Sequence, residues 1–287
     1  MNVYGLESKL RLGILDEYAK DYQIICLSET KTDAPDLSNT SLFDYTCFFK
    51  NKKVSKHKFG GIHGLCMLVN KTLSNYAKLL DEYNSNNVLW VYFDNNAFGL
   101  PYIFGAVYIP HEASKYYNYD LFDELAEDIV NIKSKFDVPI CMMGDFNSRT
   151  GNLDDFIILE EQISDICNLD SADRDIFNSK QYFEEHGLNT NRSNKDTFTN
   201  NNGFKLIEMC RCLDLKFVNG RIGNDKNIGN FTCISNQGCS TVDYCIASSE
   251  FFPYFENFTV DILDKNLSDV HSPISLTFKT DYLVHKK

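Results

Sequence analysis

Short apolar runs recur along the chain, and each is bounded by glycine, proline, asparagine or aspartate. The runs are rich in β-branched and aromatic residues, which favour the buried surface of a sheet. Because turn-favouring residues bound each of them, these runs predict strands over residues 23–28, 62–70, 88–93, 102–109, 138–144, 242–247 and 274–278.

Other segments repeat apolar residues at the spacing of a helix face. The three stripes are Leu10, Ile14, Leu15 and Tyr18; Leu121, Leu125, Ile129, Ile132 and Phe136; and Leu206, Ile207, Cys210 and Leu213. Helices and strands thus alternate with no linker rich in proline, serine or glycine, which predicts a single α/β domain over residues 1–287. The polar stretch 151–203 is the expected long loop or insertion.

The composition narrows the class of protein. With 43% hydrophobic and 14% aromatic residues among 287, the chain can build a continuous core. No apolar run reaches the length of a membrane-spanning helix, and the start of the chain, MNVYGLESKLRLG, lacks the apolar run of a signal peptide. We therefore expect an intracellular protein, nuclear or cytoplasmic, that is not secreted and has no membrane partner.

The ten cysteines predict neither disulfides nor a cofactor site. Several lie inside predicted strands, where cysteine usually acts as a small buried hydrophobe. The loose cluster Cys210, Cys212, Cys233 and Cys239 matches common zinc spacings poorly. We expect reduced thiols and no small-molecule cofactor, while the sequence leaves the oligomeric state open.

The formal net charge of -12 disfavours a broad basic surface, which supplies much of the affinity of nucleic-acid-binding proteins. A nucleic-acid substrate stays compatible with this charge. An acidic metal centre adds negative charge locally, and a few basic residues on one face can still follow a phosphate backbone.

The most informative polar residues lie at strand ends. Asp145 and Asn147, in the segment Gly144-Asp145-Phe146-Asn147, directly follow the predicted strand 138–144. A carboxylate and a carboxamide held there can project into one cleft, although a simple turn also favours these residue types. Glu29 ends the strand 23–28 in the same way, and hard cations such as Mg²⁺ prefer oxygen ligands.

A second group of candidates comes from later in the chain. Asp243 opens an apolar strand, where an unpaired carboxylate is costly, so it needs a hydrogen-bonding partner. His271 is a natural candidate, able to carry a proton or bind phosphate as a cation; a surface or core histidine is the alternative. Tyr108 ends the strand 102–109 and offers either core packing or a phosphate-contacting hydroxyl.

Taken in order, these segments resemble the endonuclease/exonuclease/phosphatase superfamily. The resemblance runs from Asn2-Val3-Tyr4-Gly5-Leu6 through LSETK, GAVYIP, MGDFNSRTG and STVDY to SDVHSPI, essentially the whole chain. Within the superfamily, LIEMCRCLDLKFVNGRIGNDKNIGNFTC followed by STVDY is most similar to the endonuclease domains of non-LTR retrotransposons.

The resemblance implies a four-layered α/β sandwich, with two mixed sheets flanked by helices, and a metal-dependent phosphodiesterase that nicks DNA. It implies Mg²⁺, or Mn²⁺, near Asn2, Glu29 and Asp269. Asp145 would orient or deprotonate the attacking water, and His271 would be supported by Asp243. Asn147 and Tyr108 would contact the scissile phosphate.

Three departures from the family pattern stand out. The family usually has a strand before the asparagine, so we expect the first strand to be missing, because the chain begins one residue ahead of Asn2. Val270 separates Asp269 from His271, whereas the family has the two adjacent. His111 replaces an asparagine that commonly follows the phosphate-contacting tyrosine and a proline.

Two rival functions remain open at this stage. One is a phosphatase or phosphodiesterase acting on a small phosphorylated molecule or a lipid headgroup, which the acidic charge favours. The other is a domesticated, inactive binding protein, favoured by the missing strand and the separated Asp-Val-His motif.

Overall fold

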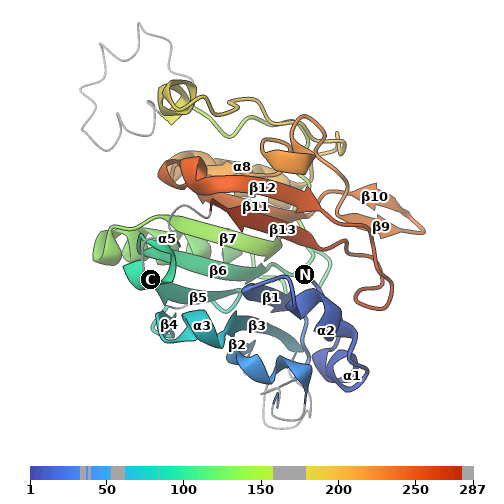
Figure 1. Ribbon diagram of the computed structural model, residues 1–287. Coiled ribbons are helices and arrows are strands. Elements are labelled where there is room, and N and C mark those ends of the chain that lie inside the picture. The colour runs from blue at the N-terminus through green and yellow to red at the C-terminus, as the bar shows by residue number, and fades with distance from the viewer. Residues whose placement is uncertain (33–36, 38–39, 53–61, 84, 158–178, 280–287) are drawn as a thin grey trace, which may run out of the picture.

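The middle of the molecule is a six-stranded sheet whose central strands are buried on both faces (Figure 1). Its order is β4 (Ala77–Leu80), β5 (Val88–Phe93), β6 (Tyr102–Tyr108), β7 (Ile140–Asp145), β11 (Asp243–Ser248) and β8 (Leu215–Phe217). Only β6 and β7 run parallel among these neighbours. Every residue of β6 and β11 is buried, as expected for strands covered on both faces.

Figure 1 is a computed structural model that describes residues 1–287 except 33–36, 38–39, 53–61, 84, 158–178 and 280–287. Against one face of the large sheet lie two smaller sheets. One has the order β1 (Ile24–Ser28), β3 (Ile62–Asn70), β2 (Tyr45–Lys52), and the other pairs β12 (Phe255–Val260) with β13 (Ile274–Phe278). An apolar cluster that includes Met67, Phe104 and Phe258 fills the space between these layers.

Helices cover the two outer faces. The helices α5 (Leu121–Phe136) and α8 (Asn201–Cys212) bury their apolar stripes against the large sheet. On the other side, α1 (Leu6–Arg11) and α2 (Ile14–Ala19) cover the β1-β3-β2 sheet. The result is helix, sheet, sheet, helix, which confirms the predicted four-layered α/β sandwich.

The remaining elements are short. They are α3 (Lys71–Ser74), α4 (Asn95–Phe98), the hairpin of β9 (Cys233–Ser235) and β10 (Gly238–Ser240), and 3₁₀ turns at η1 (Ser41–Asp44), η2 (Gly223–Asp225) and η3 (Ser249–Tyr254). No helix within the described ranges is both long and apolar enough to cross a membrane.

Each predicted strand is present, with ends shifted by at most a few residues. The first helical stripe is wrong in one respect: it forms two short helices, because Gly13 takes a left-handed φ of 66° between them. The expected loop 151–203 falls partly on residues 158–178, which lie outside the described residues. That the whole chain forms a single domain stays a prediction.

The register of the large sheet places three polar side chains side by side. Asp145, the last residue of β7, is opposite Tyr108 on β6 and opposite Asp243 on β11. Gly144 permits this arrangement, since it has a φ of +155° and a Cβ there would lie 2.0 Å from the carbonyl oxygen of Val107. The absence of a side chain at Gly144 therefore lets β6 approach the end of β7.

Replacing Gly144 with alanine should lower the free energy of unfolding by roughly 2–4 kcal/mol, because the added methyl group displaces the β6 backbone. Gly187→Ala is the matched control: Gly187 also has a positive φ, of +64°, but no atom lies within 4 Å of the position that a Cβ would take there. Its cost should be about 1–2 kcal/mol. Equal losses in urea unfolding would show that packing against Val107 is unimportant.

Candidate active site

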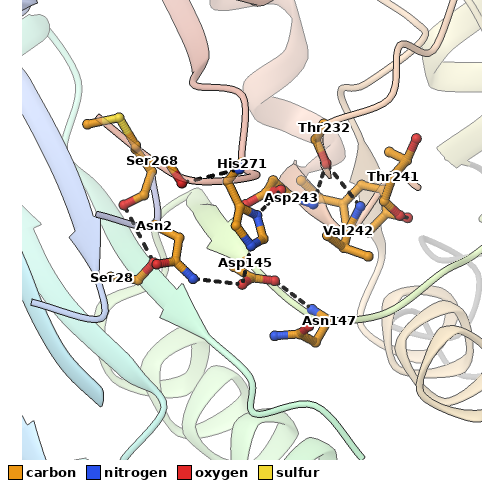
Figure 2. A network of polar contacts seen from close by, with 12 residues as sticks. Asn2, Ser28, Asp145, Asn147, Thr232, Thr241, Val242, Asp243, Ser268 and His271 are labelled. Carbon is orange, nitrogen blue, oxygen red and sulfur yellow. Dashed lines mark hydrogen bonds and ion pairs between the residues drawn. The ribbon is translucent and has the colours of Figure 1, made fainter. Parts of the chain in front are cut away.

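Asp145 lies at the centre of a polar network at the ends of β7 and β11 (Figure 2). Its side chain is 1% exposed. One carboxylate oxygen, Oδ1, accepts a hydrogen bond from the Asn147 backbone N–H at 2.9 Å. The other, Oδ2, accepts one from the Asn2 carboxamide at 3.3 Å. Neighbouring groups from distant parts of the chain thus hold a buried carboxylate in one orientation.

His271 links Asp145 to a second buried carboxylate. Its ring lies between them in Figure 2, with Nδ1 2.9 Å from Asp243 Oδ2 and Nε2 3.6 Å from Asp145 Oδ2. Asp243 is held in turn, because the Thr232 hydroxyl oxygen accepts the N–H groups of Val242 and Asp243 at 3.0 and 2.9 Å. Three residues spread over more than a hundred positions of the chain therefore form one series of contacts.

A third carboxylate approaches from β1. Glu29 follows that strand with a left-handed φ of 53° and accepts the Tyr108 hydroxyl at 2.6 Å on Oε1. The carboxamide nitrogen of Asn2 lies 3.2 Å from the same oxygen and 3.3 Å from Asp145 Oδ2. Asn2 and Tyr108 therefore connect the end of β1 with the ends of β6 and β7.

Asn147 is the second residue of this site in a left-handed conformation, with a φ of 46°. Its carboxamide nitrogen donates to the carbonyl oxygen of Ile109 at 2.8 Å, which fixes the side chain beside Asp145. Residues held in sparsely populated backbone regions concentrate at functional sites. Asn147 and Glu29 fit that pattern on either side of Asp145.

The structure does not bring Asp269 into this group. Asp269 is exposed, and no hydrogen bond or ion pair within the described part of the chain joins it to the other site residues. The neighbouring buried Ser268 is closer to the site, since its hydroxyl accepts the His271 backbone N–H at 3.2 Å. The metal role of Asp269 stays a prediction drawn from the resemblance.

Thr232 and Ser268 are contributors that the sequence reasoning missed. Both are buried, and both accept backbone N–H groups of residues that carry the site. Thr232 belongs to the segment that resembles retrotransposon endonuclease domains, but its hydroxyl accepts the Asp243 N–H only because the chain returns from β9 to β11. No local spacing indicates that contact.

Burial is the main cause of the raised pKa of Asp145. Desolvation of the carboxylate raises its pKa, the charge of His271 opposes this, and Asp243 adds to it, giving a pKa of about 7. Close to neutral pH the Asp145 side chain therefore exchanges a proton readily, as a general base must.

The pKa of His271 is also raised, but by nearby charges and not by burial. Burial favours the neutral ring, but the charges of Asp243 and Asp145 and the hydrogen bond to Asp243 outweigh it and raise the pKa to about 10. The imidazole is thus a cation near neutral pH. A protonated ring has no free lone pair for a metal, so His271 suits a negatively charged substrate better than a ligand role.

Two sets of residues could hold a metal ion. Asp145, Asp243 and His271 each place one potential ligand atom within 4.8 Å of the others. The protonated state of His271 disfavours that set. Glu29 and Asp145 instead offer carboxylate oxygens, the ligands preferred by hard divalent cations. The Asn2 carboxamide nitrogen donates to both carboxylates, while its oxygen accepts the Tyr4 N–H at 3.3 Å, so Asn2 would have to turn its carboxamide to offer an oxygen.

Comparison with known proteins gives the family. The model of the endonuclease/exonuclease/phosphatase family matches residues 1–256, and the chain belongs to this family. Members of the family are hydrolases that act on phosphodiester bonds. A search of curated protein sequences gave no match.

Solved structures of low sequence identity share the fold. The endonuclease domain of TRAS1, a telomere-specific non-LTR retrotransposon, aligns with a TM-score of 0.57 and 12% identity, over 97% of this chain and 95% of that one. An AP endonuclease from Archaeoglobus fulgidus gives 0.59 and 15%, over 96% of both chains. The 3' phosphatase NExo from Neisseria, bound to a product DNA hairpin, gives 0.57 and 15%, over 97% of both.

Asp145→Asn should stabilise the metal-free protein at high pH and leave it unchanged at low pH. The unfolded carboxyl group holds its proton only below about pH 4, whereas the folded one holds it up to about pH 7. Because the folded state binds more protons across this window, the carboxyl group reduces stability as the pH rises through it. Asparagine does not titrate, so the variant does not lose this stability as the pH rises.

Thermal unfolding in EDTA from pH 4 to pH 8 measures the difference directly. The variant should gain about 1 kcal/mol or more above pH 7, and the gain should vanish near pH 4. A constant difference across the range would show that Asp145 titrates normally in the folded protein.

Proposed function

We propose that the chain is a divalent-metal-dependent phosphodiesterase that nicks DNA, with Mg²⁺ as the metal and Mn²⁺ as a substitute. The observation that carries the proposal is the joining of Asp145 to the His271–Asp243 pair on one side and to Asn2 and Glu29 on the other. This arrangement places a base (Asp145), a cationic side chain (His271) and the oxygen ligands for a metal around one point.

In this proposal the side chains of the site divide the work of catalysis, and Asp145 serves both as base and as metal ligand. Asp145 orients and deprotonates the attacking water, for which its pKa near neutrality is suited. His271 faces the phosphate as a cation, and Asp243 holds its ring in position through Nδ1. Asn147 donates a hydrogen bond to a phosphate oxygen. The phosphate contact proposed for Tyr108 would replace the hydrogen bond that its hydroxyl donates to Glu29.

Glu29, Asn2 and Asp145 would hold the metal, and the Tyr108 hydroxyl keeps the Glu29 carboxylate in position. When bound, Mg²⁺ polarises the phosphate and stabilises the leaving oxygen. Asp269 remains a candidate for a more distant contribution, such as a water-mediated one, since its side chain is exposed.

Basic and exposed aromatic side chains on both sides of the site support a nucleic-acid substrate. On the Glu29 side, Lys31 lies 2.8 Å from the ring centre of Tyr4, whose residue is 63% exposed. On the Asn147 side, the Arg149 guanidinium lies 4.6 Å from the ring centre of the exposed Phe198. Each cation also pairs with a carboxylate, Lys31 with Glu29 at 3.7 Å and Arg149 with Asp196 at 2.6 Å, so the support comes from the exposed rings, which are suited to stacking with unstacked bases.

The retrotransposon origin is the finer part of the proposal. It is supported by the sequence segment 206–233 with STVDY, and the TRAS1 endonuclease domain shares the fold. The intracellular, nuclear or cytoplasmic location belongs to the same proposal, because a DNA-nicking enzyme must reach chromosomal or plasmid DNA.

Asp145→Asn and His271→Ala should each reduce plasmid nicking by about 10²–10⁴-fold, the usual contribution of a general base or acid. Nicking of supercoiled plasmid in Mg²⁺ measures the loss, beside thermal unfolding to confirm folding. Asp137→Asn is the matched control: it makes the same chemical change at an exposed left-handed position before β7, at the far end of that strand from Asp145.

The control should retain full activity. An Asp145→Asn rate within about tenfold of the parent would contradict the assignment of the base. Testing an abasic-site duplex, a generic phosphodiester and an inositol phosphate in parallel separates DNA nicking from a small-molecule phosphatase. A folded parent inactive on every substrate would instead favour a domesticated binding protein.

EDTA should abolish nicking, and Mg²⁺ or Mn²⁺ should restore it. Glu29→Gln should raise the Mg²⁺ concentration needed for half-maximal activity by about tenfold or more, since it weakens a ligand but leaves Asp145 and His271 in place. A titration of activity against Mg²⁺ tests this. An unchanged half-maximal concentration would remove Glu29 from the metal site.

A further inference from the structure

The ring of Phe198 is supported from one side and open to solvent on the other. Phe198 is 56% exposed, and the Arg149 guanidinium lies over its ring, 4.6 Å from the ring centre. A single exposed apolar side chain is ordinary on a protein surface. What distinguishes Phe198 is that a charged group covers one face of the ring and leaves the other face available for a contact.

A buried carboxylate fixes this arrangement. Asp196 is 2% exposed and accepts two hydrogen bonds from the Arg149 guanidinium, at 2.7 and 2.6 Å. Asp196 also accepts the Phe198 backbone N–H at 3.1 Å. Two parallel hydrogen bonds set the orientation of a guanidinium as well as its position. The cation and the backbone of Phe198 are therefore held by the same group, and we call these three residues the aromatic platform.

The aromatic platform is attached to β11 close to the site. Asp196 accepts the backbone N–H of Thr241 at 3.0 Å. Thr241 comes two residues before Asp243, the first residue of β11 and the partner of His271. The carboxylate that orients the Arg149 guanidinium therefore lies at the end of the large sheet that carries the site.

A second attachment joins the aromatic platform to the loop after β7. The Asn200 carboxamide accepts the Arg149 backbone N–H at 2.9 Å and donates to the Asn147 carbonyl at 3.3 Å. The Asn200 backbone N–H also donates to the Arg149 carbonyl at 3.0 Å. Phe198 is thus fixed beside Asn147, the residue proposed to contact the scissile phosphate.

Packing against α8 does not account for the exposed ring. Asn200 is the N-cap of α8, and an apolar residue ahead of an N-cap often packs against another in the first turns of its helix. The aromatic residue in those turns, Phe204, is itself 55% exposed. The two rings therefore do not bury one another, and the open face of Phe198 stays free for a ligand.

The charges around the site favour stacking over contacts with a duplex backbone. Arg149 pairs with Asp196 and Lys31 with Glu29, and the net charge of the chain is -12. Neutralisation of duplex phosphates by free cations is therefore weak. Bases stack on aromatic side chains without any need for positive charge, but only when they are not stacked within a duplex. An aromatic platform beside the site thus favours unpaired nucleic acid.

We propose that the aromatic platform stacks an unpaired base of the strand that is cut, next to the scissile phosphate. The substrate is then DNA that is single-stranded at the nicking position, and not a continuous duplex. The inference rests on the proposed phosphodiesterase function, to which it adds the strandedness of the substrate. Phe198 contributes binding only, while the chemistry stays with Asp145 and His271.

Binding is measured in EDTA, so that it does not depend on catalysis. Three labelled DNAs are compared by fluorescence anisotropy: a single strand, a continuous duplex, and the same duplex with a central stretch of unpaired bases. The single strand and the interrupted duplex should bind at least tenfold more tightly than the continuous duplex, which is the usual scale for a base stacked on an aromatic side chain.

Variants of exposed phenylalanines give the matched comparison. Phe198→Ala should weaken binding of the single strand about tenfold or more, whereas Phe198→Trp should preserve it, because a larger ring keeps the stacking face. Phe43→Ala is the control: Phe43 is 55% exposed and lies under Lys71, 5.9 Å from its ring centre. Phe43 leads into β2 opposite Asn70, at the far end of the smaller sheet from Glu29. Thermal unfolding checks that each variant is folded.

Two further measurements report the kind of contact. The adenine analogue 2-aminopurine loses fluorescence when it stacks, so it should be quenched at one position beside the cut, and Phe198→Ala should restore its emission. Raising NaCl from about 50 to about 200 mM should weaken binding less than tenfold, because few phosphates are contacted.

The outcomes separate this inference from the proposed function. If Phe198→Ala binds as tightly as the parent, or if the continuous duplex binds as tightly as the single strand, the aromatic platform is wrong even where the parent nicks DNA. A loss of a hundredfold or more over that range of salt would also overturn it, since phosphate contacts would then dominate. Quenching that depends on Phe198, in a protein that no metal activates, supports stacking and contradicts the phosphodiesterase proposal.

Discussion

The alignment of β6, β7 and β11 is the constraint on which the site depends. It sets Tyr108, Asp145 and Asp243 side by side at one end of the large sheet. Gly144 makes it possible, because any side chain at that position would collide with the β6 backbone. The other main residues of the site, Asn2, Glu29, Asn147 and His271, each contact one of these three residues.

This position also determines the electrostatics. The ends of strands in the middle of a sandwich are buried, so a carboxylate there loses its hydration and holds its proton more tightly. Burial by itself would lower the pKa of His271, but the charges of the two carboxylates beside it outweigh burial and raise that pKa. The pKa values of Asp145 and His271 are thus both raised because two acids and one base share a small, poorly hydrated space.

The smaller layer contrasts with the large sheet. The large sheet continues through β6, β7 and β11, whereas the facing layer is divided into two sheets with a cavity between their edges. Next to the cavity, Asn2 and Val3 pair with Ser28 at the end of β1, and the Asn2 side chain reaches Asp145 in the site. The cavity is thus lined by the middle of β1, whereas the site lies at the end of that strand, beside Glu29.

Much of this protein follows from the sequence alone. Apolar runs with β-branched residues indicated the central strands, because a strand buried on both faces must be apolar throughout. Asp145, Asn147 and Glu29 were recognisable as polar residues at strand ends, and an acid at the start of an apolar strand, Asp243, called for a partner such as His271.

Other features needed the tertiary structure. Strands β2 and β12 carry mixed polar and apolar residues, many of them half-buried or exposed, so their pattern is weak. The contacts of Thr232 and the exposure of Asp269 depend on residues far apart in the chain. Local pattern determines which segments become strands, but which strand ends meet is decided by pairing and packing over long separations.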